Sequence, residues 1–405
     1  MAQRAERESE LKRYGGLAEA FCSFENLFVA ARKAQRGKRD RPSVGRFNHR
    51  LEWELLRMQR ELEAETYQFG RFFEFRITDP KPRLISAAPY RDRVAHHAFC
   101  NVVEPVLNRG FISDSYSCRV GKGTHRAVDR FTQYARRYRY VLRADISKYF
   151  PSIDHDVLLS LIRRKIKDRK LLWFAESVVR HSNPQDPALH YFPGDHLFTP
   201  YERRRGIPIG NLTSQLFANL YLDPLDHFVK EVLRSPGYVR YTDDLALFSD
   251  DKGWLWWAAE EMTSFLQRFR LILHKRKLYV QPTRVGTDFL GYQVFPDHRR
   301  LRRCNGVRFQ RRLGELQRQY ACYEVDLENV HASVQSWIAH ASHADTHGLR
   351  TAVLAETVFQ RGATSGAGKN CGAARSTTTI PTTSPSRIAT TTIRRTATTT
   401  TGFVA

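Results

Sequence analysis

The sequence predicts an α+β protein, because segments with helical periodicity are mixed with short strand-like runs along its 405 residues. Residues 1–65 place apolar residues at helical spacing among charged ones. Aromatic and aliphatic residues at 238–241 and 245–248 are typical of two neighbouring strands. Residues 299–360 are basic and helical in pattern. We therefore expect a core of helices and strands, with one helical segment before it and another after it.

Composition divides the chain into four segments. Residues 1–65 are expected to form a helical extension, and residues 66–298 a core of helices and strands. Residues 299–360 are expected to form a separate basic helical domain. Residues 361–405 are rich in Thr and lack apolar periodicity, so we expect this tail to be disordered.

Local signals define several elements of the core. Asp154 is a suitable cap for a helix over 155–166. A further helix is expected over 254–269, and strands are expected at 278–282 and 289–295.

The charge of the chain indicates its partners. It has 65 Lys and Arg residues against 42 Asp and Glu residues, a formal net charge of +23. Such an excess favours a polyanion, and nucleic acid is the first candidate, although a ribosome-associated or membrane-surface protein is also strongly basic. No apolar run approaches the length of a membrane span, and the N-terminus is charged rather than signal-like. Six scattered cysteines without a Cys-x-x-Cys pair predict reduced thiols. We expect a cytoplasmic protein that does not contact membranes.

Two adjacent carboxylates, Asp243 and Asp244, lie between the two strand-like runs, at the expected tip of a hairpin. They could be ordinary turn residues, since Asp favours turns. Like charges held side by side repel each other unless a cation lies between them, and a divalent metal is the usual solution. The pair therefore predicts a third carboxylate and a phosphate-containing substrate.

Asp145 is the candidate for that third carboxylate, because it ends a buried apolar strand. Taken alone, it would be read as a solvated residue at a strand end. Beside Asp243, it would form a clamp for two divalent ions about 4 Å apart, which activates a 3′-hydroxyl and stabilises an in-line phosphoryl transfer. We expect two Mg²⁺ ions, with Mn²⁺ as the alternative. The expected metal ligands are Asp145, Ile146, Asp243 and Asp244.

Seven segments occur in the order of the motifs of reverse transcriptases. The palm-like segments are "RADISKYFPSID", "GIPIGNLTSQLFANLYL", "RYTDDLALF", "HKRKLYV" and "FLGYQV". Upstream, "PKPRLISAAPYRDRVAHHAFCNVVEPVL" and "SYSCRVGKGTHRA" resemble the fingers motifs of the group II intron-like branch. The resemblance covers residues from about 20 to 355 and implies a right-hand polymerase fold. In that fold, residues 1–65 extend the fingers, 66–298 form fingers and palm with an antiparallel sheet, and 299–360 form a helical thumb.

The resemblance also assigns nucleotide-binding residues. Lys81 and Arg83 suit contact with the triphosphate of an incoming dNTP, although a solvated basic loop explains them too. Phe150 lies five residues after Asp145, where reverse transcriptases place an aromatic gate against the ribose 2′-hydroxyl; it could instead be a core residue. Lys275 and Lys277 are candidates for a general acid toward the pyrophosphate leaving group, and the motif position favours Lys277.

One motif departs from most of the family, in which it reads Gln-Gly-x-x-x-Ser-Pro. Here Ile209 replaces the Gln and Gln215 replaces the Pro, while Gly210 and Ser214 are kept. These four positions are expected at the nucleotide. Both departures together resemble the reverse transcriptases of diversity-generating retroelements, which copy a template RNA into cDNA with errors at adenines. That resemblance implies a template RNA, a primer, dNTPs and a small basic accessory protein.

Two other readings stay open. One is a group II intron-like, retron or antiviral-defence reverse transcriptase of ordinary fidelity. The other is a non-catalytic RNA-binding protein that keeps the fold. The three aspartates argue against the second, because an RNA binder gains nothing from clustered acids.

Overall fold

The computed structural model describes residues 13–78, 82–182, 190–355, 357–361 and 378–379. The chain forms two compact units, residues 1–286 and residues 287–405. The basic helical segment predicted from residue 299 lies within the second unit. No helix in the described part of the chain is long and apolar enough to cross a membrane.

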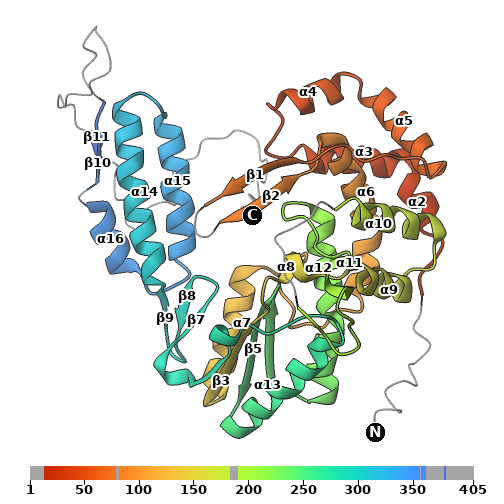
Figure 1. The fold of residues 1–405 in the computed structure, drawn as a ribbon. Coiled ribbons are helices and arrows are strands. Elements are labelled where there is room, and N and C mark those ends of the chain that lie inside the picture. The colour runs from red at the N-terminus through yellow and green to blue at the C-terminus, as the bar shows by residue number, and fades with distance from the viewer. Residues whose placement is uncertain (1–12, 79–81, 183–189, 356, 362–377, 380–405) are drawn as a thin grey trace. The chain divides into compact units, whose positions relative to one another are not determined.

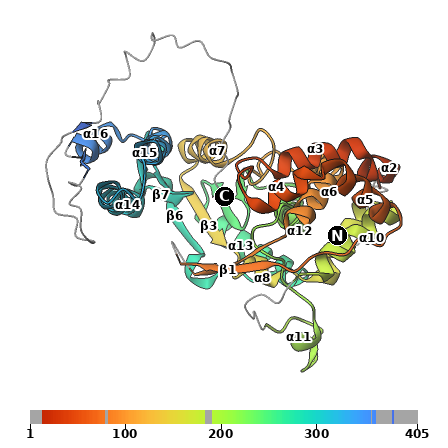
Figure 2. The same ribbon diagram turned by 90° about the horizontal axis from the view of Figure 1, so that it is seen from above.

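The first unit begins with helices that surround α6 (Tyr90–Asn108). These are α2 (Ala18–Cys22), α3 (Phe24–Ala34), α4 (Pro42–His49) and α5 (Leu51–Glu63), which form one cluster with α6 (Figure 2). Phe21 of α2 and Phe99 of α6 pack against Phe174 of α10 (Arg169–Arg180), with ring centroids 5.0 Å apart for Phe21–Phe174 and 5.3 Å apart for Phe99–Phe174. An antiparallel hairpin of β1 (Phe73–Ile77) and β2 (Arg83–Ala87) leads into α6.

The centre of this unit is a four-stranded antiparallel sheet in the order β4-β5-β3-β6, and Figure 1 labels its two central strands, β3 and β5. Its strands are β3 (Tyr140–Asp145), β4 (Gly237–Tyr241), β5 (Asp244–Ser249) and β6 (Tyr279–Pro282). One face carries Phe248, whose ring lies 4.8 Å from Phe131 of α7 (Thr124–Arg137). Side chains alternate along a strand, so Leu245 and Leu247 point to the other face, where they share a core with Met262 of α13 (Lys252–Gln267).

The edge of the sheet at β4 is covered by an irregular segment. Ser115 forms a parallel bridge with Arg240. The N–H of Arg240 donates to the carbonyl of Asp114 at 2.9 Å, and the N–H of Tyr116 donates to the carbonyl of Arg240 at 2.9 Å. The segment 114–116 thus extends the sheet by one short bridge beyond β4.

Further helices support the sheet and precede its hairpin. They are α8 (Tyr149–Ser152), α9 (His155–Lys165), α10 (Arg169–Arg180), α11 (Thr199–Glu202), α12 (Leu212–His227) and the π-helical turn Phe228–Val232. The predicted cap of α9 is confirmed, because Asp154 Oδ1 accepts the N–H groups of Asp156 and Val157, both at 3.0 Å. The predicted helix at 254–269 is α13, which begins two residues earlier, after the cap residue Asp251.

The second unit has a three-stranded antiparallel sheet and a helical part. The strands are β7 (Thr287–Phe289), β8 (Tyr292–Val294) and β9 (Arg299–Leu301), and the helices are α14 (Arg303–Ala321), α15 (Leu327–Ala341) and α16 (His347–Ala355). Phe309 of α14 stacks on Trp337 of α15 with ring centroids 4.0 Å apart, which fixes the contact between these two helices.

The structure differs, wholly or in part, from three expectations drawn from the sequence. The strand predicted at 289–295 is wrong as a single strand, because Leu290 and Gly291 have φ values of 47° and 92° and form a tight turn between β7 and β8. The expectation of reduced thiols is wrong at Cys322, which is disulfide-bonded, because sequence spacing does not report which thiols meet in space. Most of the predicted disordered tail lies outside the described residues, but Thr378–Thr379 form strand β11 and pair with β10 (Val358–Phe359).

Candidate active site

Three aspartates meet where two paired strands of the central sheet end. Asp145 is the last residue of β3, Asp244 is the first residue of β5, and the two are direct partners in the antiparallel register. Asp243 lies in the two-residue turn between β4 and β5, and its carbonyl accepts the N–H of Ile146 at 3.3 Å. The register of one sheet therefore brings together residues that are almost a hundred positions apart.

Two of the three carboxylates pair with cations. The Nζ of Lys277 lies 2.6 Å from Oδ2 of Asp145, and Arg143 forms an ion pair with Asp244. Lys277 is brought there by a short 3-10 helix, Lys275–Lys277, which follows a main-chain bond of 2.7 Å from the N–H of His274 to the carbonyl of Asp145. Lys275 is exposed. Of the two lysines proposed from sequence, Lys277 is thus the one with a bond to the aspartates.

Among the residues that the structure describes, no Lys or Arg side chain forms an ion pair with Asp243. Burial, followed by the charge of Asp145, raises the pKa of Asp243 from 3.8 to about 6. Burial also raises the pKa of Asp244, with the charge of Asp145 in the same direction and Arg143 opposing it. The three aspartates therefore carry more negative charge than Lys277 and Arg143 balance, and the excess lies at Asp243.

These residues fit a divalent cation in their chemistry. Carboxylate and carbonyl oxygens are the ligands that Mg²⁺ prefers, and Asp145, Asp243 and the main chain of Ile146 provide them. Among the described residues, no three His, Cys, Asp or Glu side chains already converge as a ligand group. The reason is visible in the ion pairs, which direct Asp145 toward Lys277 and Asp244 toward Arg143. A cation at Asp243 would replace Lys277 as the partner of Asp145.

The glycine motif lies against strand β2. The N–H of Ser86 donates to the carbonyl of Ile209 at 3.1 Å, and the N–H of Ala88 donates to Oδ1 of Asn211 at 3.3 Å. Gly210, between these two bonds, has a φ of 114°, where any side chain is strained, and a Cβ there would lie 3.1 Å from Ile85. The motif therefore needs glycine at position 210 on backbone grounds.

The other predicted nucleotide-binding residues lie on α8, α12 and β2. Phe150 is half-buried in α8, and its carbonyl accepts the N–H of Ile207 at 3.1 Å. This bond links Phe150 to the segment before Gly210. In the first turn of α12, Ser214 is buried and Gln215 is half-buried, whereas Arg83 is exposed at the start of β2. Lys81 lies outside the described residues.

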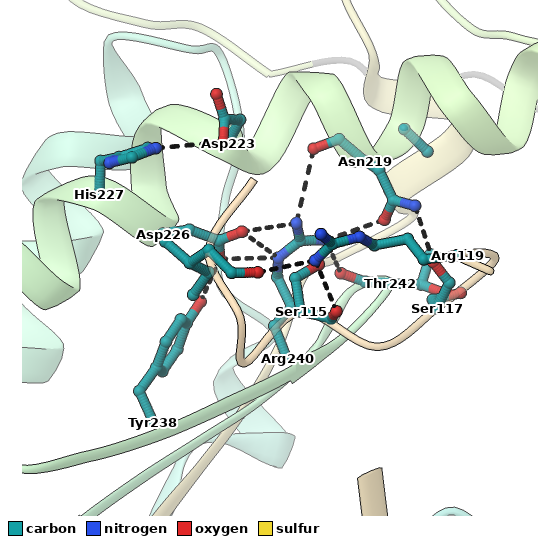
Figure 3. Close-up of polar contacts among 12 residues, drawn as sticks. Ser115, Ser117, Arg119, Asn219, Asp223, Asp226, His227, Tyr238, Arg240 and Thr242 are labelled. Atoms are coloured by element: carbon teal, nitrogen blue, oxygen red, sulfur yellow. Dashed lines mark hydrogen bonds and ion pairs between the residues drawn. The ribbon is translucent and has the colours of Figure 1, made fainter. Parts of the chain in front are cut away.

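Two arginines at the site were not predicted. Arg143 pairs with Asp244 and also lies over the ring of Phe131, 5.8 Å from its centroid. Arg240 is wholly buried and pairs with Asp226 of α12 at 2.6 Å (Figure 3). The available signal was that both are charged residues inside otherwise apolar strands, where a charge requires a partner.

Two curated proteins and one solved structure are similar to parts of this chain. "Protein YkfC" of Escherichia coli is 27% identical over 45% of this chain and 47% of its own length. "Group II intron-encoded protein LtrA" of Lactococcus lactis is 23% identical over 52% of this chain and 33% of its own length. The chain thus spans about half or less of the curated relatives that it matches. A solved telomerase from Candida albicans matches 64% of this chain and 52% of its own, with 12% identity and a TM-score of 0.39.

The family model "Reverse transcriptase (RNA-dependent DNA polymerase)" matches residues 78–294, more than half of the chain. The match begins in the connection between β1 and β2 and includes all three aspartates, the glycine motif and Lys277. The predicted α+β right-hand polymerase fold, with an antiparallel palm sheet, is thereby confirmed. The chain belongs to the reverse transcriptase (RNA-dependent DNA polymerase) family.

Proposed function

We propose that the protein is an RNA-directed DNA polymerase, which makes cDNA from dNTPs on a template RNA. The observation that carries the proposal is the meeting of Asp145, Asp243 and Asp244 at the ends of paired strands, with Lys277 beside them. Clustered carboxylates repel phosphates and would weaken a protein that only binds RNA. They become useful when a cation lies between them and the substrate.

We propose that Asp145, Asp243 and the carbonyl of Ile146 would hold divalent metal, with Asp244 next to them. Two bound Mg²⁺ ions supply Lewis-acid stabilisation of the attacking and leaving oxygens in an in-line transfer. The chain positions these ligands through its sheet register, since Asp145 and Asp244 are direct partners. The raised pKa of Asp243 supports the proposal, because a bound cation would offset both the burial and the repulsion from Asp145 that raise it.

Lys277 is proposed as the general acid of the reaction. Its ammonium group is 2.6 Å from Asp145 and would lose that partner when the carboxylate binds metal. A protonated amine at this place can donate its proton to the pyrophosphate oxygen as it leaves. The 3-10 helix that carries Lys277 is tied to Asp145 by the bond from His274, so the donor stays close to the metal ligands.

We further propose that Phe150 acts as the gate against the ribose 2′-hydroxyl and that the glycine motif contacts the nucleotide. The support is that the main chain joins them, through the bond from Ile207 to Phe150. Gly210, with a φ of 114°, carries no side chain that would keep a ligand away from its backbone. Ser214, Gln215, Arg83 and Lys81 complete the proposed nucleotide-binding set.

At a finer level, we propose an error-prone enzyme of a diversity-generating retroelement, which works with a template RNA, a primer and a small basic accessory protein. The support is the apolar side chain of Ile209 together with Gln215, in place of the Gln and Pro of most relatives. A hydrogen-bonding side chain at position 209 would hold the templating base more firmly. The second candidate is a group II intron-like enzyme of ordinary fidelity, which the similarity to the intron-encoded protein LtrA favours.

Primer extension on a defined RNA tests the proposed activity. We expect Asp145→Asn and Asp243→Asn to reduce dNTP incorporation by about 100-fold or more while RNA affinity stays nearly unchanged. Asp156→Asn, at an exposed acid on α9, is the matched control and should polymerise normally. Near-normal synthesis by either active-site variant would contradict the assignment.

Sequencing of the cDNA separates the two candidates. A diversity-generating enzyme should misincorporate at template adenines well above the other three bases, and Ile209→Gln should lower that bias. An even and low error spectrum in the wild-type protein would favour the group II intron-like enzyme.

A further inference from the structure

A buried ion pair lies beneath the turn that carries Asp243. Arg240 of β4 and Asp226 of α12 have no exposed surface. Nε of Arg240 donates to Oδ1 and Oδ2 of Asp226 at 2.7 and 2.9 Å, and Nη2 donates to Oδ2 at 2.6 Å. The hydroxyl of Tyr238 donates to the same carboxylate at 2.8 Å (Figure 3). Because burying two charges costs much of what their attraction returns, stability alone is a weak explanation for this pair.

The guanidinium has a further bond that leads to the turn. Nη1 of Arg240 donates to the carbonyl of Thr242 at 3.1 Å and to Oδ1 of Asn219 at 3.3 Å. Thr242 directly precedes Asp243 in the sequence. Asp226 of α12 thus holds Nε and Nη2 of the guanidinium. Nη1 holds the main-chain carbonyl of Thr242, next to the proposed metal ligand Asp243.

The turn is held in a conformation that its own sequence disfavours. Thr242 has a φ of 54°, in the left-handed region that β-branched residues rarely adopt. Its hydroxyl donates to Oγ of Ser117 at 2.7 Å, and Ser117 is in turn fixed because its carbonyl accepts Nδ2 of Asn219 at 2.8 Å. Two contacts, from Arg240 and from Ser117, therefore act against the local preference of the chain.

We propose that Arg240 is a positioning residue for Asp243. Fixed by Asp226, its guanidinium keeps Thr242 in the left-handed conformation and so sets where the Asp243 carboxylate lies relative to Asp145. Arg240 touches no reacting atom in this arrangement. Lysine cannot replace it, because one ammonium lacks the planar fork that reaches a carboxylate and a carbonyl at once.

The same network includes the helix that begins with the glycine motif. Asn219 and Asp226 lie on α12, whose first turn contains Ser214 and Gln215. Arg240 therefore connects the helix proposed to bind the nucleotide with the turn proposed to bind metal. This inference rests on the proposed function for its catalytic meaning, but the position of Asp243 can be tested without catalysis.

The test compares two kinds of variant in the full-length protein. Arg240→Lys keeps a positive charge for Asp226 but removes the bond to Thr242. The combined variant Asp226→Leu, Tyr238→Phe, Arg240→Met replaces the buried polar group by apolar residues, which commonly preserves folding. Urea unfolding reports the fold, and calorimetric titration with Mn²⁺ reports the aspartates directly. Rates of single-nucleotide incorporation at saturating dNTP report kcat.

We expect both variants to bind Mn²⁺ about 10-fold more weakly and to lose on the order of 10- to 100-fold in kcat, with unfolding curves that show a folded protein. Arg203→Lys is the matched control, since Arg203 is a buried arginine paired with Asp195 at 3.1 Å and with Asp154 at 3.5 Å. It should leave Mn²⁺ affinity unchanged. If the combined variant does not fold, Arg240→Lys decides alone.

Wild-type Mn²⁺ affinity and kcat in a folded Arg240→Lys protein would overturn the positioning role. An equal loss of Mn²⁺ affinity in Arg203→Lys would overturn it as well, because the effect would then be a general loss of stability. If the wild-type protein binds Mn²⁺ but makes no DNA, the proposed function fails while the comparison of Mn²⁺ affinities still tests Arg240.

Discussion

Asp243 is the residue at which stability and activity are expected to conflict. Its folded-state pKa of about 6 lies above its ordinary value of 3.8, so the fold disfavours the ionised form. This penalty is absent at low pH, grows as the pH rises from about 4 to about 6, and is complete above that range. The same carboxylate is proposed to bind metal, which explains why such a penalty would be retained.

Asp243→Asn should therefore stabilise the metal-free protein at pH 8 while it abolishes synthesis. A rise in pKa from 3.8 to about 6 would correspond to about 3 kcal/mol for a fully shielded group. Because solvent reaches the half-buried Asp243, we expect the free energy of unfolding to rise by about 1–2 kcal/mol. Urea unfolding in the presence of EDTA measures this. The gain should shrink as the pH falls through 4 and disappear near pH 3, about one unit below the ordinary pKa of 3.8, where the wild-type carboxyl is largely protonated in both states. A variant that is less stable than the wild type at pH 8 would contradict the charge excess at this turn.

Phe150 offers a second test at the scale of one residue. Phe150→Ala or Phe150→Val removes the half-buried ring and should let a ribose 2′-hydroxyl enter. We expect the ratio of rNTP to dNTP incorporation efficiency to rise by about 10-fold or more, as for other cases in which one contact discriminates between substrates. Phe28→Val, on α3, is a control for the loss of a half-buried ring elsewhere. An unchanged ratio would make Phe150 a core residue only.

At the scale of elements, Asp154 joins the start of α9 to two distant arginines. It caps the helix, and its Oδ2 lies 2.7 Å from Arg270 and 3.5 Å from Arg203. Asp154→Ala removes the cap and leaves buried or half-buried cations without this partner, so we expect a loss of about 3–5 kcal/mol in the free energy of unfolding. Asp156→Ala, in the same first turn but exposed, should cost less than about 1 kcal/mol. Equal effects of the two substitutions would show that neither the cap nor the arginine contacts of Asp154 contribute to stability.

The elements also show what sequence can predict. The cap of α9 was predictable because Asp154 acts on the two N–H groups directly after it. The β7–β8 turn was not, because Leu290 has a positive φ that a non-glycine residue seldom adopts. The same distinction holds at the site. The three aspartates follow from motif order and strand register, whereas the pairing of Arg240 with Asp226 depends on how α12 packs on the sheet.

At the scale of the whole molecule, the net charge of +23 predicts how RNA binding responds to salt. Basic side chains release counterions from the phosphates that they neutralise, so the logarithm of RNA affinity should fall linearly with the logarithm of salt concentration. We expect a slope steeper than about −3, as for five or more contacts to a single strand. Filter binding or fluorescence anisotropy measures it, and Asp243→Asn should have the same slope. An RNA affinity that does not change with salt concentration would exclude distributed phosphate contacts as the source of RNA binding.

The segment 114–116 has a consequence for how the protein behaves at high concentration. An uncovered edge strand offers free N–H and C=O groups to any extended chain, and it is a common starting point for aggregation. At β4 the N–H and C=O of Arg240 are already bonded to Asp114 and Tyr116, so these two groups are not open to a foreign strand beside the turn that carries Asp243. On the opposite side β6 is only four residues long and ends in Pro282, which has no N–H to donate. The sheet that carries the aspartates is thus partly covered on one edge and short on the other, which leaves few main-chain groups for edge-to-edge pairing with a neighbouring copy.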